Sequence, residues 1–217
     1  MTRRAETLSD LLENNRRWAR RMLERDGDYF RNLSKGQRPR FMWIGCSDSR
    51  VMPTALLGVG AEEVFVFRNI ANLARPDEAA ARAAVTFAVE FLRVRHIMVA
   101  GHTSCGGVAA ALNGSAPPET MSWVEPVRAV LAGNREKLEA LPEEERADAL
   151  AELNVRAQVL GVASMPAVQE AWSRGQKLSV HGLMFHLSEG LLHDLNVSLR
   201  GCADVPEELR LAGKCGG

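Results

Sequence analysis

Short apolar runs alternate with helical patterns along most of the chain. The apolar runs predict strands at residues 40–45, 63–67, 96–101 and 177–187. Between them, acidic residues after Pro76 open an alanine-rich segment that is typical of a helix. Because strands alternate with helices, we expect an α/β fold with a mostly parallel central β-sheet flanked by helices.

The first part of the chain has a different pattern. Residues 7–33 carry apolar side chains at helical spacing, with Thr7 or Ser9 as a cap and Gly27 as a break. We expect an N-terminal helical arm of two helices. Such an arm either crosses to a partner chain or covers its own sheet.

The later part of the chain is mostly helical before it returns to strands. Residues 119–174 have the pattern of consecutive helices. The expected breaks fall near Gly133, Pro142 and Gly161. After the strand at 177–187, residues 192–199 are expected to pair back as a late antiparallel edge strand.

Composition mainly excludes functions. The 217 residues are 46% apolar and 25% charged, which suits one soluble globular domain with a sizeable core. The 27 basic and 27 acidic side chains balance, so neither a nucleic-acid nor a membrane partner is expected. The polar start of the chain differs from an export signal and favours a cytoplasmic location. We divide the expected single domain, 1–217, into an arm (1–36), an α/β body (37–200) and a C-terminal tail (201–217).

Four cysteines are present, and they fall into two groups. In a cytoplasmic chain, cysteines are more often metal ligands or free thiols than disulfides. Cys46 and Cys105 have neighbours that suit a metal site. Cys202 and Cys215 lie in a glycine-containing stretch without a partner motif, and we expect them to have no specific role.

Two of the predicted strands end in residues that bind soft metals. Cys46 follows one strand, and His102 with Cys105 follows another. Reactive groups of α/β proteins collect at the carboxyl ends of strands. Two thiolates and one imidazole are a ligand set of catalytic zinc sites, in which one position stays open. The alternatives are buried cysteines with a structural histidine, or a closed structural zinc site.

Asp48 and Arg50 decide between an open and a closed site. Asp48 could be the fourth zinc ligand, which would close the site. If the loop curls, Arg50 instead pairs with it bidentately and leaves it to accept a hydrogen bond from a zinc-bound hydroxide, which would orient a lone pair for attack. Two thiolate ligands should make the bound water less acidic than at a three-histidine site, so activity should rise toward alkaline pH.

Three motifs resemble the signatures of the β-class carbonic anhydrases: CSDSRV at 46–51, RNIAN at 68–72 and GHTSCGG at 101–107. The likeness extends from the arm to QKLSVHG at 176–182. It implies reversible hydration of CO2 to bicarbonate and a proton, by attack of a zinc-bound hydroxide.

The resemblance also implies roles for individual residues. Cys46, His102 and Cys105 would bind one Zn2+ per chain, and Asp48 with Arg50 would form the catalytic dyad, Asp48 joining the zinc only in a closed state. Substrate contacts would come from Gln37, Phe65, Ile70, Phe87 and Gly106. Homodimers or homotetramers are implied, with the arm crossing to a partner.

Two departures from the family pattern concern aromatic residues. Phe87 stands where many members have tyrosine. Trp43 and Arg68 match a bicarbonate-binding regulatory pocket, but Phe185 replaces its tyrosine, which removes one hydrogen bond worth about 0.5–1.5 kcal/mol, or about 1.5–3 kcal/mol to a charged partner.

Two other functions remain open from the sequence. One is hydrolysis of carbonyl sulfide or carbon disulfide at a similar zinc site, which pocket size and access would decide. The other is a zinc-stabilised binding or scaffold protein without catalysis, against which the paired Asp48 and Arg50 argue. No histidine is an obvious proton shuttle, His186 and His193 included.

Overall fold

The computed structural model describes residues 5–215. The chain divides into two compact units, Met1–Gln37 and Arg38–Gly217. Among the described residues, no helix is both long enough and apolar enough to cross a membrane.

The first unit contains the expected two helices, α1 (Leu8–Arg25) and α2 (Tyr29–Leu33). Thr7 caps α1: its hydroxyl accepts the Asp10 N–H at 3.2 Å, and the Asp10 carboxylate accepts the Thr7 N–H at 2.9 Å. None of the residues of α1 is buried, and Leu8 is 71% exposed. Trp18 packs against Phe30 of α2, with ring centroids 5.4 Å apart, but the leucines at the start of α1 stay exposed.

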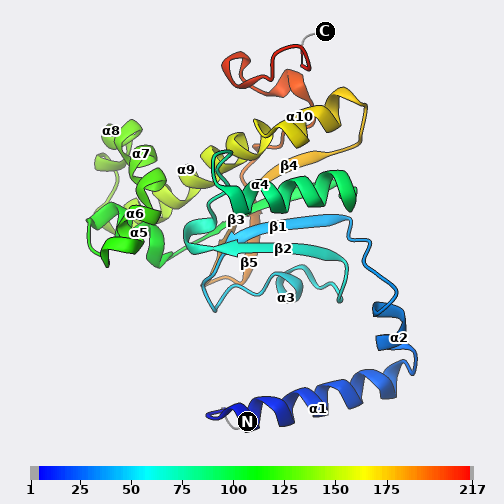
Figure 1. Ribbon diagram of the computed structural model, residues 1–217. Coiled ribbons are helices and arrows are strands. Elements are labelled where there is room, and N and C mark those ends of the chain that lie inside the picture. Colours follow the sequence, from blue (N-terminus) through cyan, green and yellow to red (C-terminus); the bar gives the residue numbers. More distant parts are fainter. Residues whose placement is uncertain (1–4, 216–217) are drawn as a thin grey trace. The chain divides into compact units, whose positions relative to one another are not determined.

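The second unit is built on a five-stranded sheet of order β2-β1-β3-β4-β5 (Figure 1). The strands are β1 (Phe41–Cys46), β2 (Val64–Asn69), β3 (His96–His102), β4 (Ser179–His186) and β5 (Leu191–Asp194). The first four are parallel, and β5 pairs antiparallel with β4. These findings confirm the expected fold class.

The order of the strands reverses direction at β1, next to the candidate site residues. From β1 the chain passes to β2 on one side, and then to β3 on the other side of β1. Ligands of open α/β sheets bind outside the carboxyl ends of the strands at such a reversal. Cys46 ends β1 and His102 ends β3, so both lie at this point.

Helices cover the sheet, and most lie in the region where the sequence predicts them. They are α3 (Pro53–Leu57), α4 (Ala79–Thr86), α5 (Gly106–Asn113), α6 (Pro118–Trp123), α7 (Glu125–Gly133), α8 (Arg135–Glu139), α9 (Glu143–Ala163) and α10 (Pro166–Ser173), with short turns η1 (Ile70–Asn72), η2 (Phe87–Phe91), η3 (Cys202–Asp204) and η4 (Glu207–Leu209). Val155, Val159 and Val162 of α9 join the strand residues Ile97 and Val99 in the main core.

Two expected boundaries of secondary structure shift. The break expected near Gly161 falls after Ala163, where α9 ends, so Gly161 itself lies inside the helix. A Cβ at Gly161 would lie 3.1 Å from the Ala74 carbonyl oxygen, so this glycine allows a close approach of the helix to a neighbouring loop. The edge strand ends at Asp194, since Asn196 adopts a positive φ of 56°; beyond it, Leu199 forms a single bridge with Val180.

The expectations that the cysteines are metal ligands or free thiols, and that Cys202 and Cys215 have no specific role, are wrong for this pair. The structure joins them in a disulfide, with Cα atoms 5.3 Å apart. The turns η3 and η4 fold the tail back, and the buried Gln169 of α10 holds it by donating a hydrogen bond to the Leu209 carbonyl at 2.8 Å. Tertiary packing, which no local motif indicates, brings the two thiols together.

Candidate metal centre and active site

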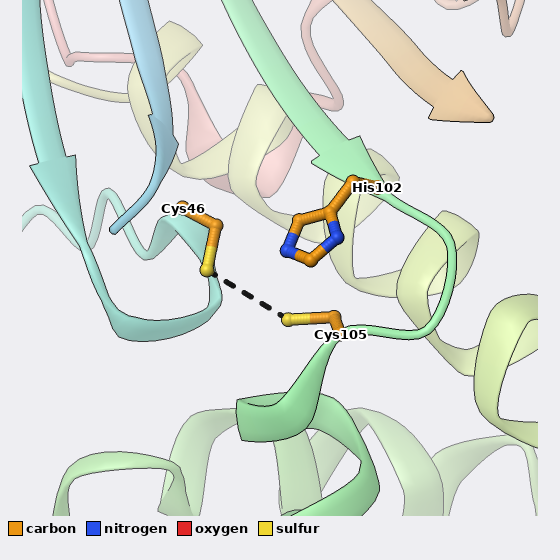
Figure 2. A group of neighbouring side chains, drawn as sticks. All are labelled: Cys46, His102 and Cys105. Carbon is orange, nitrogen blue, oxygen red and sulfur yellow. Dashed lines mark hydrogen bonds between the residues drawn. The ribbon is translucent and has the colours of Figure 1, made fainter. Parts of the chain in front are cut away.

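Two strand ends and one helix start converge on a single buried point (Figure 2). Cys46 comes from β1, His102 from β3, and Cys105 is the residue that precedes α5. Cys46 is 5%, His102 1% and Cys105 2% exposed. Each residue offers one ligand atom, a cysteine sulfur or a histidine ring nitrogen. These three atoms lie within 4.8 Å of one another, as a shared metal ion requires.

The distance between the two sulfurs suits zinc. Cys46 Sγ lies 3.8 Å from Cys105 Sγ. Two sulfur ligands about 2.3 Å from a tetrahedral zinc lie about 3.8 Å apart. The pair of cysteines therefore spans one edge of a zinc tetrahedron without any movement of the backbone.

His102 presents a free lone pair to the same point. Its Nδ1 lies 2.9 Å from the Thr103 carbonyl oxygen, which can only accept, so Nδ1 carries the proton. Nε2 is buried and has no hydrogen-bond partner among residues 5–215. A buried unpartnered acceptor is costly, and a metal ion would satisfy it. The tautomer is the one that a metal-binding histidine with a backbone partner adopts.

The charges of the cluster favour a cation. A hydrogen bond from Cys105, helped by His102, lowers the pKa of the Cys46 thiol although burial opposes the change. The same hydrogen bond, with burial, raises the pKa of Cys105. Burial disfavours a charged His102, but the neighbouring Cys46 thiolate outweighs this effect and raises the imidazole pKa. The shifts favour ionisation of Cys46 before Cys105, and a bound dication would favour the thiolate form of both cysteines.

Asp48 faces this cluster but is held by Arg50. Arg50 Nε donates to Asp48 Oδ1 at 2.9 Å, and Nη2 donates to Oδ2 at 2.7 Å. The Arg50 backbone N–H also donates to Oδ1 at 2.9 Å. These bonds, the Arg50 side chain first, hold the pKa of Asp48 well below its usual range. Asp48 Oδ2 nevertheless lies only 3.8 Å from His102 Nε2.

A loop after β3 positions Cys105, and sequence reasoning missed its support. Ser104 adopts a positive φ of 54°, which turns the chain back toward the cluster. Its N–H donates to Asp148 Oδ1 of α9 at 2.7 Å, and its carbonyl accepts from Arg50 Nη2 at 3.1 Å. Asp148 is remote in sequence and lies in a charged helix, so no local pattern indicates this role.

Two buried amides of α9 support the loop after β2, and they too were missed. Asn154 Nδ2 donates to the Ala71 carbonyl at 2.9 Å, and Gln158 Nε2 donates to Asn154 Oδ1 at 3.0 Å. Gln158 Oε1 accepts the Ala74 N–H at 2.8 Å. Ala71 adopts a positive φ of 62°, which is strained for an alanine, and the amide chain holds it there. Polar residues on the buried face of a helical pattern are the signal that could have found them.

The residues predicted to contact substrate fall into three places. Ile70 lies beside the start of α5, because a Cβ at Gly107 would be 2.5 Å from its side chain, and Gly106 opens that helix. Phe65 and Phe87 pack on each other with ring centroids 5.7 Å apart. Gln37 is exposed and is the last residue of the first unit. The substrate contacts of all five residues stay predictions.

The three residues of the predicted regulatory pocket surround the end of β1. Trp43 and Phe185 belong to one small core cluster, and the Trp43 indole covers Gly45. Arg68, which pairs with Gly45 in the sheet, donates to the carbonyls of Cys46 at 2.8 Å and Asp48 at 2.6 Å. Trp43 Nε1 is buried and finds no partner within the described part of the chain.

The fold and the cluster together define a class: an α/β protein with a Cys-His-Cys cluster, able to hold a metal ion, at the reversal of a parallel sheet. Residues 41–192 match the family model described as carbonic anhydrase. The chain belongs to the carbonic anhydrase family, in its β class.

Sequence relatives and solved structures agree with this assignment. A carbonic anhydrase from Emericella nidulans is 37% identical over 92% of this chain and 89% of its own. One from Pseudomonas aeruginosa is 30% identical over 96% of this chain and 98% of its own. A β-carbonic anhydrase from Coccomyxa, solved with acetazolamide, superposes with a TM-score of 0.88 at 38% identity, covering 94% of this chain and 95% of its own. A tetrameric β-carbonic anhydrase from Sordaria macrospora has a TM-score of 0.83 at 36% identity. The match covers 87% of this chain and 96% of the other.

Proposed function

We propose that this carbonic anhydrase hydrates CO2 reversibly to bicarbonate and a proton, with one zinc held by Cys46, His102 and Cys105 and with Asp48 and Arg50 as the catalytic dyad. The observation that carries the mechanism is the bidentate Arg50–Asp48 pair, in which Asp48 Oδ2 lies 3.8 Å from His102 Nε2. Three protein ligands leave one position of a zinc tetrahedron open.

The bound ion would supply an activated water, to a larger extent at alkaline pH. The protein residues would orient the reaction. Arg50 keeps Asp48 ionised, so the carboxylate can only accept a hydrogen bond. It would accept one from the attacking O–H group and direct an oxygen lone pair toward CO2. Because Arg50 occupies both carboxylate oxygens, Asp48 stays off the metal and the site stays open.

The substrate would lie on the apolar side of the centre. Ile70, 39% exposed beside the start of α5, provides an apolar surface next to Cys105. The Gly106 amide at that helix start would donate to a substrate oxygen. Phe65 and Phe87 would complete the pocket, and Gln37 would serve the zinc site of a partner chain.

The test is stopped-flow CO2 hydration by protein of measured zinc content at pH 7 and pH 9. We expect about one zinc per chain and activity that rises with pH. Asp48→Asn should keep zinc and lower turnover by about 100-fold, since the oriented acceptor is lost. The matched control is Asp77→Asn, because Asp77 pairs with Arg75 at the same spacing elsewhere in the chain.

Three outcomes would contradict this proposal in different ways. One zinc per chain with no hydration at either pH would favour a structural zinc. Faster hydrolysis of carbonyl sulfide in a parallel assay would favour the sulfur substrate. Unchanged turnover in Asp48→Asn would contradict the catalytic role of Asp48 and Arg50, but it would not contradict the proposed zinc ligands.

We also propose that the protein is a cytoplasmic homodimer or homotetramer. The exposed apolar residues of α1 support association, since Leu8, Leu11 and Leu12 are each about half exposed or more. The Sordaria macrospora relative is described as tetrameric. Light scattering after gel filtration would test the assembly, and a mass of one chain would contradict it. Fractionation of the source cells would test the location.

A further inference from the structure

We propose that the β4–β5 hairpin carries a second divalent-metal site, formed by His186, Glu189 and His193. One ligand atom from each of these residues lies within 4.8 Å of the others. The group shares no residue with the Cys-His-Cys cluster, and the proposed hydration reaction does not use it.

The strand register places both imidazoles on one face of the hairpin. His186 pairs with Leu191, and His193 pairs with Met184. Residues two apart on a strand share a face, so His186 lies on the face of Met184 and therefore on that of His193. The two rings have centroids 4.3 Å apart.

Glu189 places its carboxylate between the two rings. Its Oε2 lies 2.7 Å from His193 Nε2, and its Oε1 lies 3.5 Å from His186 Nδ1. The turn that carries Glu189 is well defined: the N–H groups of Glu189 and Gly190 donate to the His186 carbonyl at 3.2 and 2.8 Å. Gly190 has a φ of 73°, which glycine adopts without strain.

The hairpin is also fixed to the body of the protein. The Leu187 N–H donates to Thr103 Oγ1 at 3.0 Å, and the Thr103 N–H donates to the Phe185 carbonyl at 3.0 Å. The three ligand groups are thus held near one another before a metal arrives, which reduces the entropy lost on binding.

The ligand types indicate which metals would bind. Two imidazoles and one carboxylate suit Zn2+ and its neighbours Ni2+ and Cu2+, and they leave open positions for water. The side chains are 29%, 46% and 45% exposed in the order His186, Glu189, His193, so an ion can enter and leave. We expect weaker binding than at the buried centre, whose two thiolates carry more negative charge.

The test is calorimetric titration of ZnCl2 into protein that already holds one zinc per chain. We expect one further saturable site in the wild type. His193→Gln and Glu189→Gln should each weaken that site at least about tenfold. Glu144→Gln, which changes an exposed carboxylate on α9, is the matched control and should bind as the wild type does. Equal binding by His193→Gln and wild type, or no second site up to millimolar zinc, would overturn the proposal.

A second measurement keeps this result independent of stability and of the catalytic centre. Co2+ added to the one-zinc protein should give ligand-field bands without sulfur-to-cobalt charge transfer, because the hairpin offers no thiolate. Charge-transfer bands would show that the added metal reaches the cysteines instead. Unchanged thermal unfolding of the two variants in their one-zinc form would show that they fold.

Discussion

Arg50 holds both carboxylate oxygens of Asp48, with Nε 2.9 Å from Oδ1 and Nη2 2.7 Å from Oδ2. The side chain of Arg50 is 53% exposed and that of Asp48 is 17% exposed. Solvent therefore reaches the guanidinium but little of the carboxylate. Arg50 also donates to the Ser104 carbonyl, which ties the pair to the loop that carries Cys105. The proposed dyad and the metal centre are therefore one connected structure.

Replacing Arg50 by lysine should lower CO2 hydration while zinc stays bound. A lysine ammonium cannot form the planar bidentate pair, so Asp48 would lose its orientation or turn toward the metal. We expect turnover to fall by roughly 10- to 100-fold at pH 8, measured by stopped flow. Arg75→Lys, which changes the comparable pair with Asp77, is the control. A zinc content that falls together with activity would point to a structural role instead.

Removing one sulfur of the cluster should remove the metal. Cys105→Ser replaces a thiolate ligand by a hydroxyl, and we expect less than a tenth of the wild-type zinc after dialysis against a weak chelator. Cys202→Ser changes a cysteine outside the cluster and should keep its zinc. Elemental analysis against protein concentration measures both. Full zinc in Cys105→Ser would contradict the assigned ligand set.

The Cys202–Cys215 disulfide should contribute to stability. It closes a loop over a sequence separation of 13 residues, which corresponds to about 3 kcal/mol in the chain-entropy model. The double variant Cys202→Ser/Cys215→Ser should therefore unfold at lower denaturant under non-reducing conditions. A thiol assay on chelated, unfolded protein should find two reactive thiols before reduction and four after it. Four thiols before reduction would exclude the bond.

Acid should destabilise the body through two partly buried histidines. His96 Nδ1 lies 3.1 Å from His181 Nε2, and His181 Nδ1 lies 2.8 Å from Ser198 Oγ. Burial lowers the pKa of both imidazoles, and nearby positive charge adds to it. The unfolded chain therefore binds more protons, and the free energy of unfolding should fall as pH falls below about 6.5.

Urea unfolding at pH 8 and pH 6 of the one-zinc protein measures this dependence. His181→Gln should show a smaller loss of stability between the two pH values, because it removes one histidine whose pKa is lowered by folding. His193→Gln removes an exposed histidine and should keep the wild-type loss. An equal loss in all three proteins would assign the acid sensitivity to other groups.

Bicarbonate should regulate the wild-type protein only weakly, and the substitution Phe185→Tyr should strengthen this regulation. Trp43 offers a buried N–H that has no partner among residues 5–215, and Arg68 lies across from Gly45 in the sheet, but Phe185 supplies no hydroxyl. Phe185→Tyr would add one donor to an anion, worth about 1.5–3 kcal/mol. The pH–rate profile with and without bicarbonate should therefore separate more in the variant than in the wild type. Phe67→Tyr, on β2, is the control, and equal profiles throughout would exclude the pocket.

The sequence by itself determined most of the elements and the residues that could hold a metal ion. Strand ends, caps and glycine turns depend on neighbouring residues, so the arm with its Thr7 cap, the parallel strands and the Cys46, His102, Cys105 cluster could be predicted. The helix starting at Pro53 and ending before Gly58 has the same local origin.

The tertiary structure alone decided what depends on distant residues. Close approach of backbones gave Gly161 a packing role within a continuous helix, and the fold of the tail brought Cys202 to Cys215. The supports of the site loops come from α9, far along the chain, and antiparallel register brought His186 to His193. Local patterns carry no information about such contacts, because packing and register set them only when the whole sheet is assembled.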